Sequence, residues 1–232
     1  MAKRKGSAVL ARVLGALALV TLIAGGWVWW HLRHWQPTRE EYPLQGVEIG
    51  AMDGPIDWGT IKGIGANFAY IDASASASAR DPRFTENLRG ALKAGMQVGA
   101  LHRYDPCQPA DAQAANFVTT VPRDPKLLPP AVELDTTAEG CLVAVSDAKV
   151  ESELMTFLNQ VETHTGRPTI LKLTETFEDT YGVAARIDRN LWLVSDRFQP
   201  DYAGRHWTMW TANKHLANEV GETDLRWVVV RP

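Results

Sequence analysis

After residue 42 the apolar positions follow two patterns along the chain, one typical of amphipathic helices and one typical of buried strands. Three stretches repeat their apolar residues every three to four positions, which is typical of amphipathic helices: 82–94, 110–121 and 147–165. Ser146 stands where an N-cap is expected for the third helix, and Gly166-Arg167-Pro168 provides a stop signal. The buried stripe predicted for this helix consists of Val150, Leu154, Phe157, Leu158 and Val161.

Between these helices lie short apolar runs of the length of buried strands. We expect strands at 47–49, 68–73, 97–104, 131–135, 169–174, 191–195, 207–210 and 225–230. Strands that alternate with helices indicate an α/β fold, either a parallel barrel or a doubly wound sheet. Helices become sparse after residue 183, so the last strands follow one another directly. The Ala/Ser-rich residues 73–79 are interpreted as a loop over the cleft.

The N-terminal segment has the composition of a membrane anchor. Lys3, Arg4 and Lys5 precede an uncharged run at 13–30, and Trp27, Trp29, Trp30 and Trp35 gather at its far end. Such a run is near the minimum for crossing a bilayer, and a tryptophan belt is typical of the membrane–water interface. We therefore expect an uncleaved helix across the inner membrane, with its N-terminus in the cytoplasm and the domain in the periplasm or outside; a cleaved signal peptide is the alternative.

The predicted organisation follows from this anchor. Residues 1–12 form a cytoplasmic basic tip, 13–34 the transmembrane helix, 35–42 a linker and 43–232 one domain. Without the four basic residues before position 13, the chain has 20 Lys and Arg against 27 Asp and Glu. An acidic domain does not favour nucleic-acid binding, which needs a basic face. Nothing in the sequence indicates a cofactor, a metal site or an oligomer, so we expect a monomer.

The two cysteines, Cys107 and Cys141, flank the predicted strand at 131–135. Outside the cytoplasm such a pair is expected to form a disulfide. In the loop-entropy model, a closed loop of this length contributes roughly 3–4 kcal/mol to stability.

The strand at 131–135 also carries the most informative pattern, because Glu133 and Asp135 lie two residues apart. Side chains at positions i and i+2 of a strand point to the same side, so the two carboxylates should be neighbours. Glu48 ends another short strand in the same way. Paired carboxylates in one cleft are what glycosidic bond cleavage requires, although such acids also cap strands and bind loops.

Several short motifs, in the same order along the chain, resemble the lysozymes of glycoside hydrolase family 25. They cover residues 42–230 and include Gln45-Gly46-Val47-Glu48-Ile49, Gly54-Pro55-Ile56-Asp57-Trp58, Phe68-Ala69-Tyr70-Ile71-Asp72-Ala73-Ser74, Leu128-Pro129-Pro130 and Trp207-Thr208-Met209-Trp210. The resemblance implies an irregular (β/α) barrel of TIM type, with five strand–helix units followed by three strands. It also implies cleavage of the β-1,4 bond after N-acetylmuramic acid in peptidoglycan.

By position in this resemblance, Asp135 is the expected proton donor, and Glu133 and Glu48 are its electrostatic partners. The candidate saccharide-binding residues are the polar or aromatic side chains near other strand ends: Asp72, His102, Tyr104, Asp196 and Trp210. His102 is equally well explained as a core histidine.

The departures from the family fall on these positions. Glu48 stands where the family has aspartate, the family order Asp-x-Glu is inverted in Glu133-x-Asp135, and an expected acid is replaced by Ala75. Three hypotheses therefore remain: a muramidase with re-spaced carboxylates, a saccharide-binding relative that no longer cleaves, or a scaffold protein of the envelope.

Overall fold

The computed structural model describes residues 3–218 and 223–232. The chain divides into two compact units, Met1–Trp35 and Gln36–Pro232. The first contains helix α1 (Lys3–Arg33). Its segment Arg12–Arg33, 22 residues long, is long and apolar enough to cross a membrane, a property that signal sequences share.

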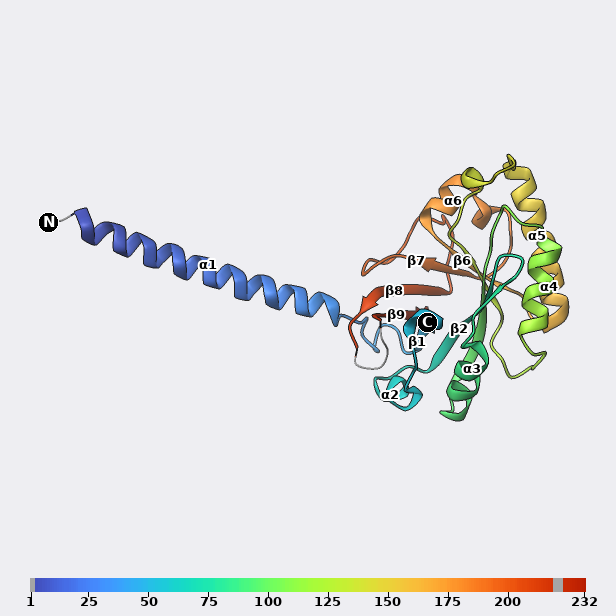
Figure 1. Cartoon of the computed structure of the whole chain (residues 1–232), viewed down its shortest axis with the longest axis horizontal. Coiled ribbons are helices and arrows are strands. Elements are labelled where there is room, and N and C mark those ends of the chain that lie inside the picture. Colours follow the sequence, from blue (N-terminus) through green and yellow to red (C-terminus); the bar gives the residue numbers. More distant parts are fainter. Residues whose placement is uncertain (1–2, 219–222) are drawn as a thin grey trace. The chain divides into compact units, whose positions relative to one another are not determined.

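The second unit is built on a sheet that closes on itself (Figure 1). Its neighbouring strands follow the order β1-β9-β8-β7-β6-β5-β4-β2, and β1 pairs with β2 to complete a barrel of eight strands. Strand β9 runs antiparallel to β8 and β1, whereas the other neighbours in the barrel are parallel. The barrel strands are β1 (Gln45–Ile49), β2 (Phe68–Ala75), β4 (Gln97–Arg103), β5 (Ala131–Leu134), β6 (Ile170–Leu173), β7 (Leu191–Val194), β8 (Met209–Leu216) and β9 (Leu225–Val230).

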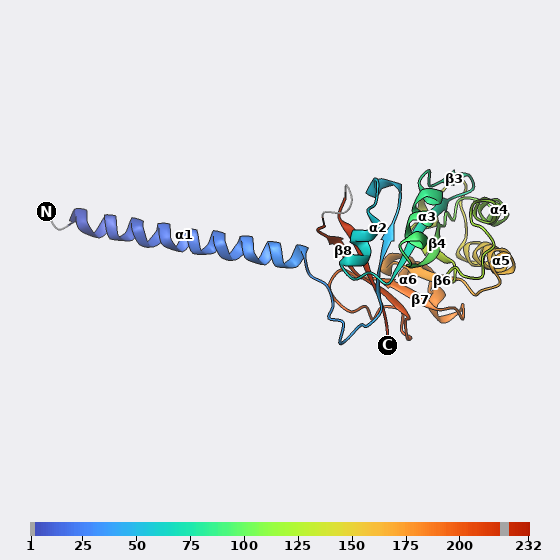
Figure 2. The same ribbon diagram turned by 90° about the horizontal axis from the view of Figure 1, so that it is seen from below.

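The helices cover the outside of this barrel, and α4 and α5 lie side by side (Figure 2). They are α2 (Trp58–Gly63), α3 (Phe84–Lys93), α4 (Ala110–Thr120), α5 (Asp147–Thr165) and α6 (Glu175–Tyr181), with short 3-10 turns at Ala51–Asp53, Ala138–Gly140 and Val183–Ala185. Five strand–helix units are thus followed by three strands. The predicted barrel is confirmed, and the β1–β2 pairing excludes an open doubly wound sheet.

Side chains alternate between the barrel interior and the helices, as the two-residue period of strands requires. The interior holds an apolar layer of Phe68, Tyr70, Leu101, Ala131, Ile170, Trp192, Met209 and Val228. Burial of each large side chain contributes roughly 1.5–3 kcal/mol. Two positions further along β2, β4, β5 and β6, towards their carboxyl ends, the inward positions are charged, whereas those of β7 and β8 are Val194 and Thr211. The apolar layer is therefore the floor beneath the strand-end acids.

Local signals place most of the helices correctly. Ser146 caps α5, its hydroxyl accepting a hydrogen bond from the Lys149 amide. Asp57 caps α2, a short helix that the sequence pattern did not predict. The residues expected to form a loop after β2 instead form a hairpin with β3 (Ala79–Arg80), in which Ser74 pairs with Arg80 and Ser76 adopts a positive φ of 50°.

Candidate functional site

Strand register brings five charged side chains together at the carboxyl ends of the parallel strands. Arg103 on β4 is the partner of Glu133 on β5, and Glu133 is the partner of Lys172 on β6. Across the antiparallel pair, Glu48 on β1 faces Arg226 on β9. Because strands in a sheet are about 4.8 Å apart, matched positions on one face place these groups within ion-pair distance.

Lys172 lies between two carboxylates inside the barrel. Its Nζ is 2.6 Å from Glu48 Oε2 and 2.6 Å from Glu133 Oε1, and 3% of its side chain is exposed. The contact with Glu133 is a hydrogen bond, whereas Glu48 Oε2 makes an ion pair without hydrogen-bond geometry. Burial disfavours the charged ammonium, but the attraction of Glu48 and Glu133 outweighs it and raises the pKa of Lys172. The lysine therefore stays charged at neutral pH.

Arg226 is the second cation of the cluster. Its Nε donates to Glu48 Oε1 at 3.0 Å, and its Nη2 donates to Asp53 Oδ2 at 2.8 Å. Asp53 also accepts a hydrogen bond from the backbone amide of Gly50, which closes the turn after β1. Arg226 thus ties β9 to the turn that follows β1.

Glu133 is held between two cations. Arg103 Nε donates to its Oε2 at 2.9 Å, and Lys172 donates to its Oε1 at 2.6 Å. Burial opposes ionisation of Glu133, but these two partners prevail and lower its pKa to about 2. Glu133 is therefore a carboxylate at neutral pH and holds no proton to donate.

Asp72 behaves in the opposite way. Burial first, and then the neighbouring charge of Glu48, raise the pKa of Asp72 to about 7. Its nearest cation is Arg103, whose Nη2 lies 3.8 Å from Asp72 Oδ2. Asp72 Oδ1 is buried and has no hydrogen-bond partner. Asp72 is the member of the cluster most ready to hold a proton.

Asp135 lies immediately after β5 and is exposed to solvent. Its Oδ1 accepts a hydrogen bond from the Thr136 hydroxyl at 3.0 Å. Its charge also contributes to the raised pKa of Arg103, so the two groups interact electrostatically, although burial and the attraction of Glu133 and Asp72 affect Arg103 more strongly. Among the three acids proposed for catalysis, Asp135 is the one with a freely solvated carboxyl group.

Two of the residues predicted to bind saccharide, His102 and Tyr104, lie on the outer side of the barrel and not in its mouth. His102 is fully buried; its ring stacks on Phe157 of α5 and its nitrogens contact Ser74 and Gln113. Tyr104 packs edge-on against the same phenylalanine. Because His102 alternates with the inward-facing Arg103, its side chain points away from the strand-end acids. The structure thus matches the core interpretation of His102 and does not place either residue in the cleft.

Trp210 is buried, whereas Asp196 lies next to a strand end. Trp210 is 3% exposed, packs against Tyr42 and Trp207, and donates from Nε1 to the Ser195 carbonyl, so its ring offers no open face for a sugar. Asp196 follows β7 and accepts a hydrogen bond from the amide of Lys214, which connects the end of β7 to β8.

The predicted disulfide is present between Cys107 and Cys141. It joins the loop after β4 to the loop that begins with Asp135 and leads into α5. Among the described residues, no group of three or more His, Cys, Asp or Glu side chains is arranged to hold a metal ion.

A pocket of about 480 Å³ lies over the charged layer, within the size range of small-molecule sites. Glu133, Lys172 and Arg226 form part of its wall, and the other polar residues that line it are Asp53, Thr211, Lys214, His215, Thr223 and Asp224. A smaller pocket of about 200 Å³ shares Met52 with it and lies at the carboxyl ends of β2 and β4, with Asp72 and Arg103 in its wall.

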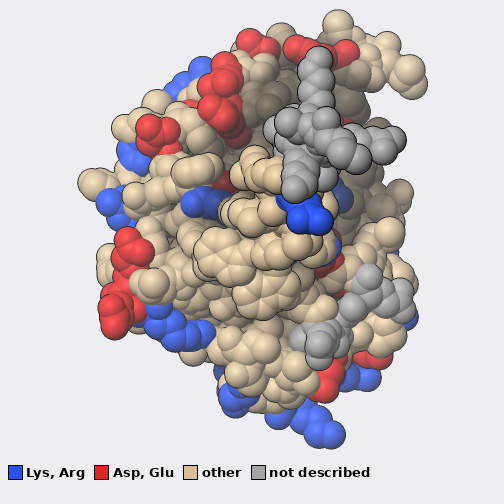
Figure 3. All heavy atoms as spheres, turned by 90° about the vertical axis from the view of Figure 1, so that its left-hand side faces the viewer, with Lys and Arg blue, Asp and Glu red and all other residues tan. Residues whose placement is uncertain are grey.

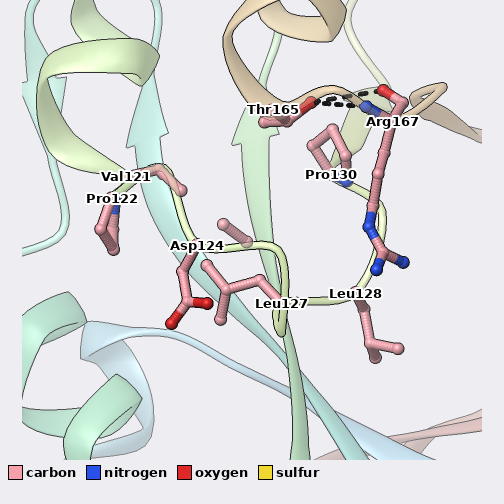
Figure 4. A pocket seen from close by; sticks show the side chains of 9 residues that line it. Val121, Pro122, Asp124, Leu127, Leu128, Pro130, Thr165 and Arg167 are labelled. Carbon is pink, nitrogen blue, oxygen red and sulfur yellow. Dashed lines mark hydrogen bonds between the residues drawn. The ribbon is translucent and has the colours of Figure 1, made fainter.

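The opposite end of the barrel has a pocket of about 690 Å³ with His206, Trp207 and Arg231 in its wall, and a much smaller one. Figure 4 shows the smaller pocket, with Asp124, Leu127 and Arg167 in its wall; its volume of about 10 Å³ accommodates only a water molecule. On the face of the molecule shown in Figure 3, acidic and basic side chains are interspersed.

Sequence reasoning found the acids of the site but missed its cations. Lys172 interrupts the apolar run Ile170–Leu173, and Arg226 interrupts Leu225–Val230. A charged residue at an inward position of a buried strand needs a partner, so this pattern could have identified both residues.

The geometry of a barrel mouth lined with acids agrees with the comparison to known proteins. The family model for glycosyl hydrolases family 25 matches residues 47–219. The chain belongs to this family.

Solved structures of the family share the fold. A family 25 glycosyl hydrolase from Bacillus anthracis aligns with a TM-score of 0.76 and 26% identity, covering 85% of this chain and 92% of that chain. A bacterial lysozyme from Streptomyces coelicolor aligns with a TM-score of 0.69 and 24% identity, covering 81% of this chain and 91% of that chain, and supports the fold alone.

Curated relatives are longer than the matched region. The uncharacterized protein YegX of Escherichia coli (strain K12) is 26% identical over 176 residues, which are 73% of this chain and 62% of YegX. Lysozyme M1 of Streptomyces globisporus is 27% identical over 142 residues, 59% of this chain and 48% of the lysozyme. The chain therefore spans about half to three fifths of the length of these relatives.

Proposed function

We propose that the domain is a lysozyme-like hydrolase that cleaves the β-1,4 bonds of peptidoglycan glycan strands with re-spaced catalytic carboxylates. The observation that carries this proposal is the pair Glu133 and Asp135 at the carboxyl end of β5, where Glu133 lines a pocket of about 480 Å³ and Asp135 is exposed to solvent. Catalytic groups of barrels of this type come from the carboxyl ends of the strands. The family, in which peptidoglycan is the substrate, supports the same conclusion.

In this proposal Asp135 is the general acid. It gives its proton to the glycosidic oxygen as the bond from that oxygen to the anomeric carbon breaks. Glu133 is ionised, with Glu48 beside it, and stabilises the positive charge that develops at the anomeric carbon. Water then adds to that carbon, and its proton returns to Asp135. Lys172 weakens the field of the two glutamates, because it neutralises part of their charge.

The test is incubation of the full-length chain, in mild detergent, with purified peptidoglycan, followed by mass spectrometry of the released muropeptides. We expect new reducing ends at muramic acid from the native chain and none from Asp135→Asn. Asp124→Asn is the matched control, because Asp124 is an exposed aspartate at the opposite end of the barrel (Figure 4). Equal release by Asp135→Asn and the native chain would remove Asp135 from the role of acid.

A second candidate function is glycan binding without cleavage. Arg103, Lys172 and Arg226 favour it, because each is within ion-pair distance of an acid of the cluster. Neutralised carboxylates stabilise a cationic transition state less well than free ones. Sedimentation of the native chain with peptidoglycan, without any release of muropeptides, would favour this candidate over the hydrolase.

We also propose that α1 is an uncleaved anchor in the inner membrane, which leaves the domain outside the cytoplasm as a monomer next to the cell wall. The length and composition of Arg12–Arg33 support this position, and so does the disulfide, which is typical of oxidising compartments. The domain boundaries proposed from the sequence, with a barrel domain at 43–232, belong to the same proposal.

A further inference from the structure

The acids near the strand ends differ in how closely they are paired with lysine and arginine side chains. In the described part of the chain, Glu48 has ion pairs with Lys172 and Arg226, and Glu133 has them with Lys172 and Arg103. Asp53, buried in the turn after β1, is paired with Arg226. Each of these acids has at least one cation at 3.0 Å or less.

Asp72, near the end of β2, has one ion pair among the described residues, and that pair is long. Arg103 Nη2 is 3.8 Å away, while the Nε of the same guanidinium is committed to Glu133 at 2.9 Å. Asp72 Oδ1 is buried without a hydrogen-bond partner. A buried carboxylate without a matched cation is costly, and it avoids that cost by binding a proton.

Backbone geometry at the neighbouring strand makes room for this carboxyl group. A Cβ atom at Gly50 would lie 2.4 Å from Asp72 Oδ2, so only glycine allows the side chain to occupy its position there. Asp72 and Arg103 then form part of the wall of a pocket of about 200 Å³, together with Ala51 and Ala75.

Three other polar side chains of that pocket are already engaged elsewhere. The Ser74 hydroxyl forms a hydrogen bond with His102 Nδ1 at 2.8 Å. Asp81 accepts hydrogen bonds from the amides of Ala51 and Arg83. Arg80 donates from its guanidinium to Asn116 and Thr119. Asp72 and the half-exposed guanidinium of Arg103 are thus the groups in the pocket wall that remain to meet a ligand.

We propose that this pocket is a saccharide subsite in which Asp72, in its protonated form, and Arg103 donate hydrogen bonds to a neutral acceptor oxygen of the glycan, such as an acetamido carbonyl. The inference rests on the proposed function, because it takes the glycan as the ligand. A protonated carboxyl group is a donor, whereas a carboxylate only accepts. The subsite therefore binds uncharged acceptors best while Asp72 keeps its proton, and binds them more weakly once it ionises.

The charges around Asp72 agree with this behaviour. Burial and Glu48 on β1 raise the pKa of Asp72, and Arg226 on β9, Lys172 on β6 and Arg103 on β4 lower it to a smaller extent, which leaves it at about 7. Asp81 and Arg80 on the far wall are held by the bonds described above. His215 lies in the wall of the adjacent larger pocket.

The test is the affinity of the full-length chain for the tetramer of N-acetylglucosamine, measured by calorimetry between pH 5.5 and 8.5 in an Asp135→Asn background that prevents cleavage. We expect binding to weaken roughly five- to ten-fold as the pH rises through about 7, the loss of one hydrogen-bond donor. Adding Asp72→Asn should abolish this pH dependence, because the amide donates a hydrogen bond at every pH. His215→Gln, in contrast, should retain it.

Affinity that does not change with pH, or a pH dependence that persists in the Asp72→Asn variant, would overturn the subsite and leave the proposed function intact. If the chain releases muropeptides but does not bind the tetramer, the subsite is overturned and the proposed function stands. If it does neither, the proposed function is overturned as well. A second measurement needs no ligand: the carboxyl ¹³C resonance of Asp72 should titrate near pH 7 in the free chain, and a midpoint near 4 would contradict the proposal.

Discussion

At the scale of single residues, the ammonium group of Lys172 connects two carboxylates that lie on different strands. It is buried with Glu48 and Glu133 at 2.6 Å, above an apolar floor. An ion pair in such a place gains little over an apolar pair of the same shape, because removal of both charges from water is costly. Removing one partner, however, leaves an uncompensated buried charge. Loss of the lysine alone should therefore be strongly destabilising.

Lys172→Met should lower the free energy of unfolding by about 3–5 kcal/mol, since Glu48 and Glu133 then face each other without their shared cation. The measurement is denaturant unfolding of the full-length chain in detergent, followed by fluorescence. Lys149→Met is the control, because Lys149 forms an exposed pair with Glu153 on α5 and should contribute no more than about 1 kcal/mol. A loss below about 1 kcal/mol for Lys172→Met would mean that the ion pairs do not hold the barrel mouth together.

Asp72 predicts a dependence of stability on pH. Its pKa rises on folding from 3.8 to about 7, so the folded state binds the proton more tightly. The resulting stabilisation is complete below pH 4 and disappears as the pH rises through about 7. The two values set an upper limit of about 4 kcal/mol, which is lower in practice because a quarter of the side chain is exposed.

Asp72→Asn should therefore be less sensitive than the native chain to a change from pH 5 to pH 8. The check is a pair of melting-temperature profiles over that range. Parallel profiles for the two proteins would contradict a raised pKa at Asp72.

The residues of the site were only partly predictable from the sequence. Glu133 and Asp135 were recognisable from their spacing on one strand, which is a local feature. Their cations were not, because the contacts are remote: Lys172 is 39 residues from Glu133, and Arg226 is 178 residues from Glu48. Only the closure of the barrel brings these positions together. His102 shows the reverse effect, since the same alternation that turns Arg103 inward turns His102 towards α5.

At the scale of secondary-structure elements, periodicity predicted the long helices and the barrel strands well. Helix α5 spans the residues expected from its stripe and caps. The pattern was less informative for short elements. Helix α2 has six residues and strand β3 has two, too few for a helical or strand periodicity to be recognised. These elements are determined by their neighbours, as β3 is by its pairing with β2.

The disulfide acts at this same scale, because it connects the loops that follow β4 and β5. Replacing both Cys107 and Cys141 with serine should lower the free energy of unfolding by about 3–4 kcal/mol, the loop-closure entropy of a cross-link spanning 34 residues. Unfolding of the native chain after reduction provides the comparison and should give the same loss. A difference of less than about 1 kcal/mol between oxidised and reduced protein would contradict a stabilising role.

At the scale of the whole molecule, the chain has an apolar N-terminal helix and a barrel that belongs to the glycosyl hydrolases of family 25. If α1 remains attached, the protein should stay with the membrane fraction after alkaline carbonate extraction, and mass spectrometry should recover peptides from residues 12–33. A chain that lacks residues 3–33 should be released. Recovery of the domain in the soluble fraction with a shortened N-terminus would instead identify the segment as a cleaved signal peptide.

The central claim is that this barrel mouth cleaves glycan strands although its carboxylates are re-spaced and paired with cations. The most direct measurement is muropeptide release from purified peptidoglycan by the native chain beside Glu133→Gln, Asp135→Asn and Asp124→Asn. We expect the native chain and Asp124→Asn to release muropeptides with new muramic acid reducing ends. Glu133→Gln should release far fewer of them, and Asp135→Asn none. Peptidoglycan that binds the native chain but stays intact would contradict the claim and leave a saccharide-binding member of the family.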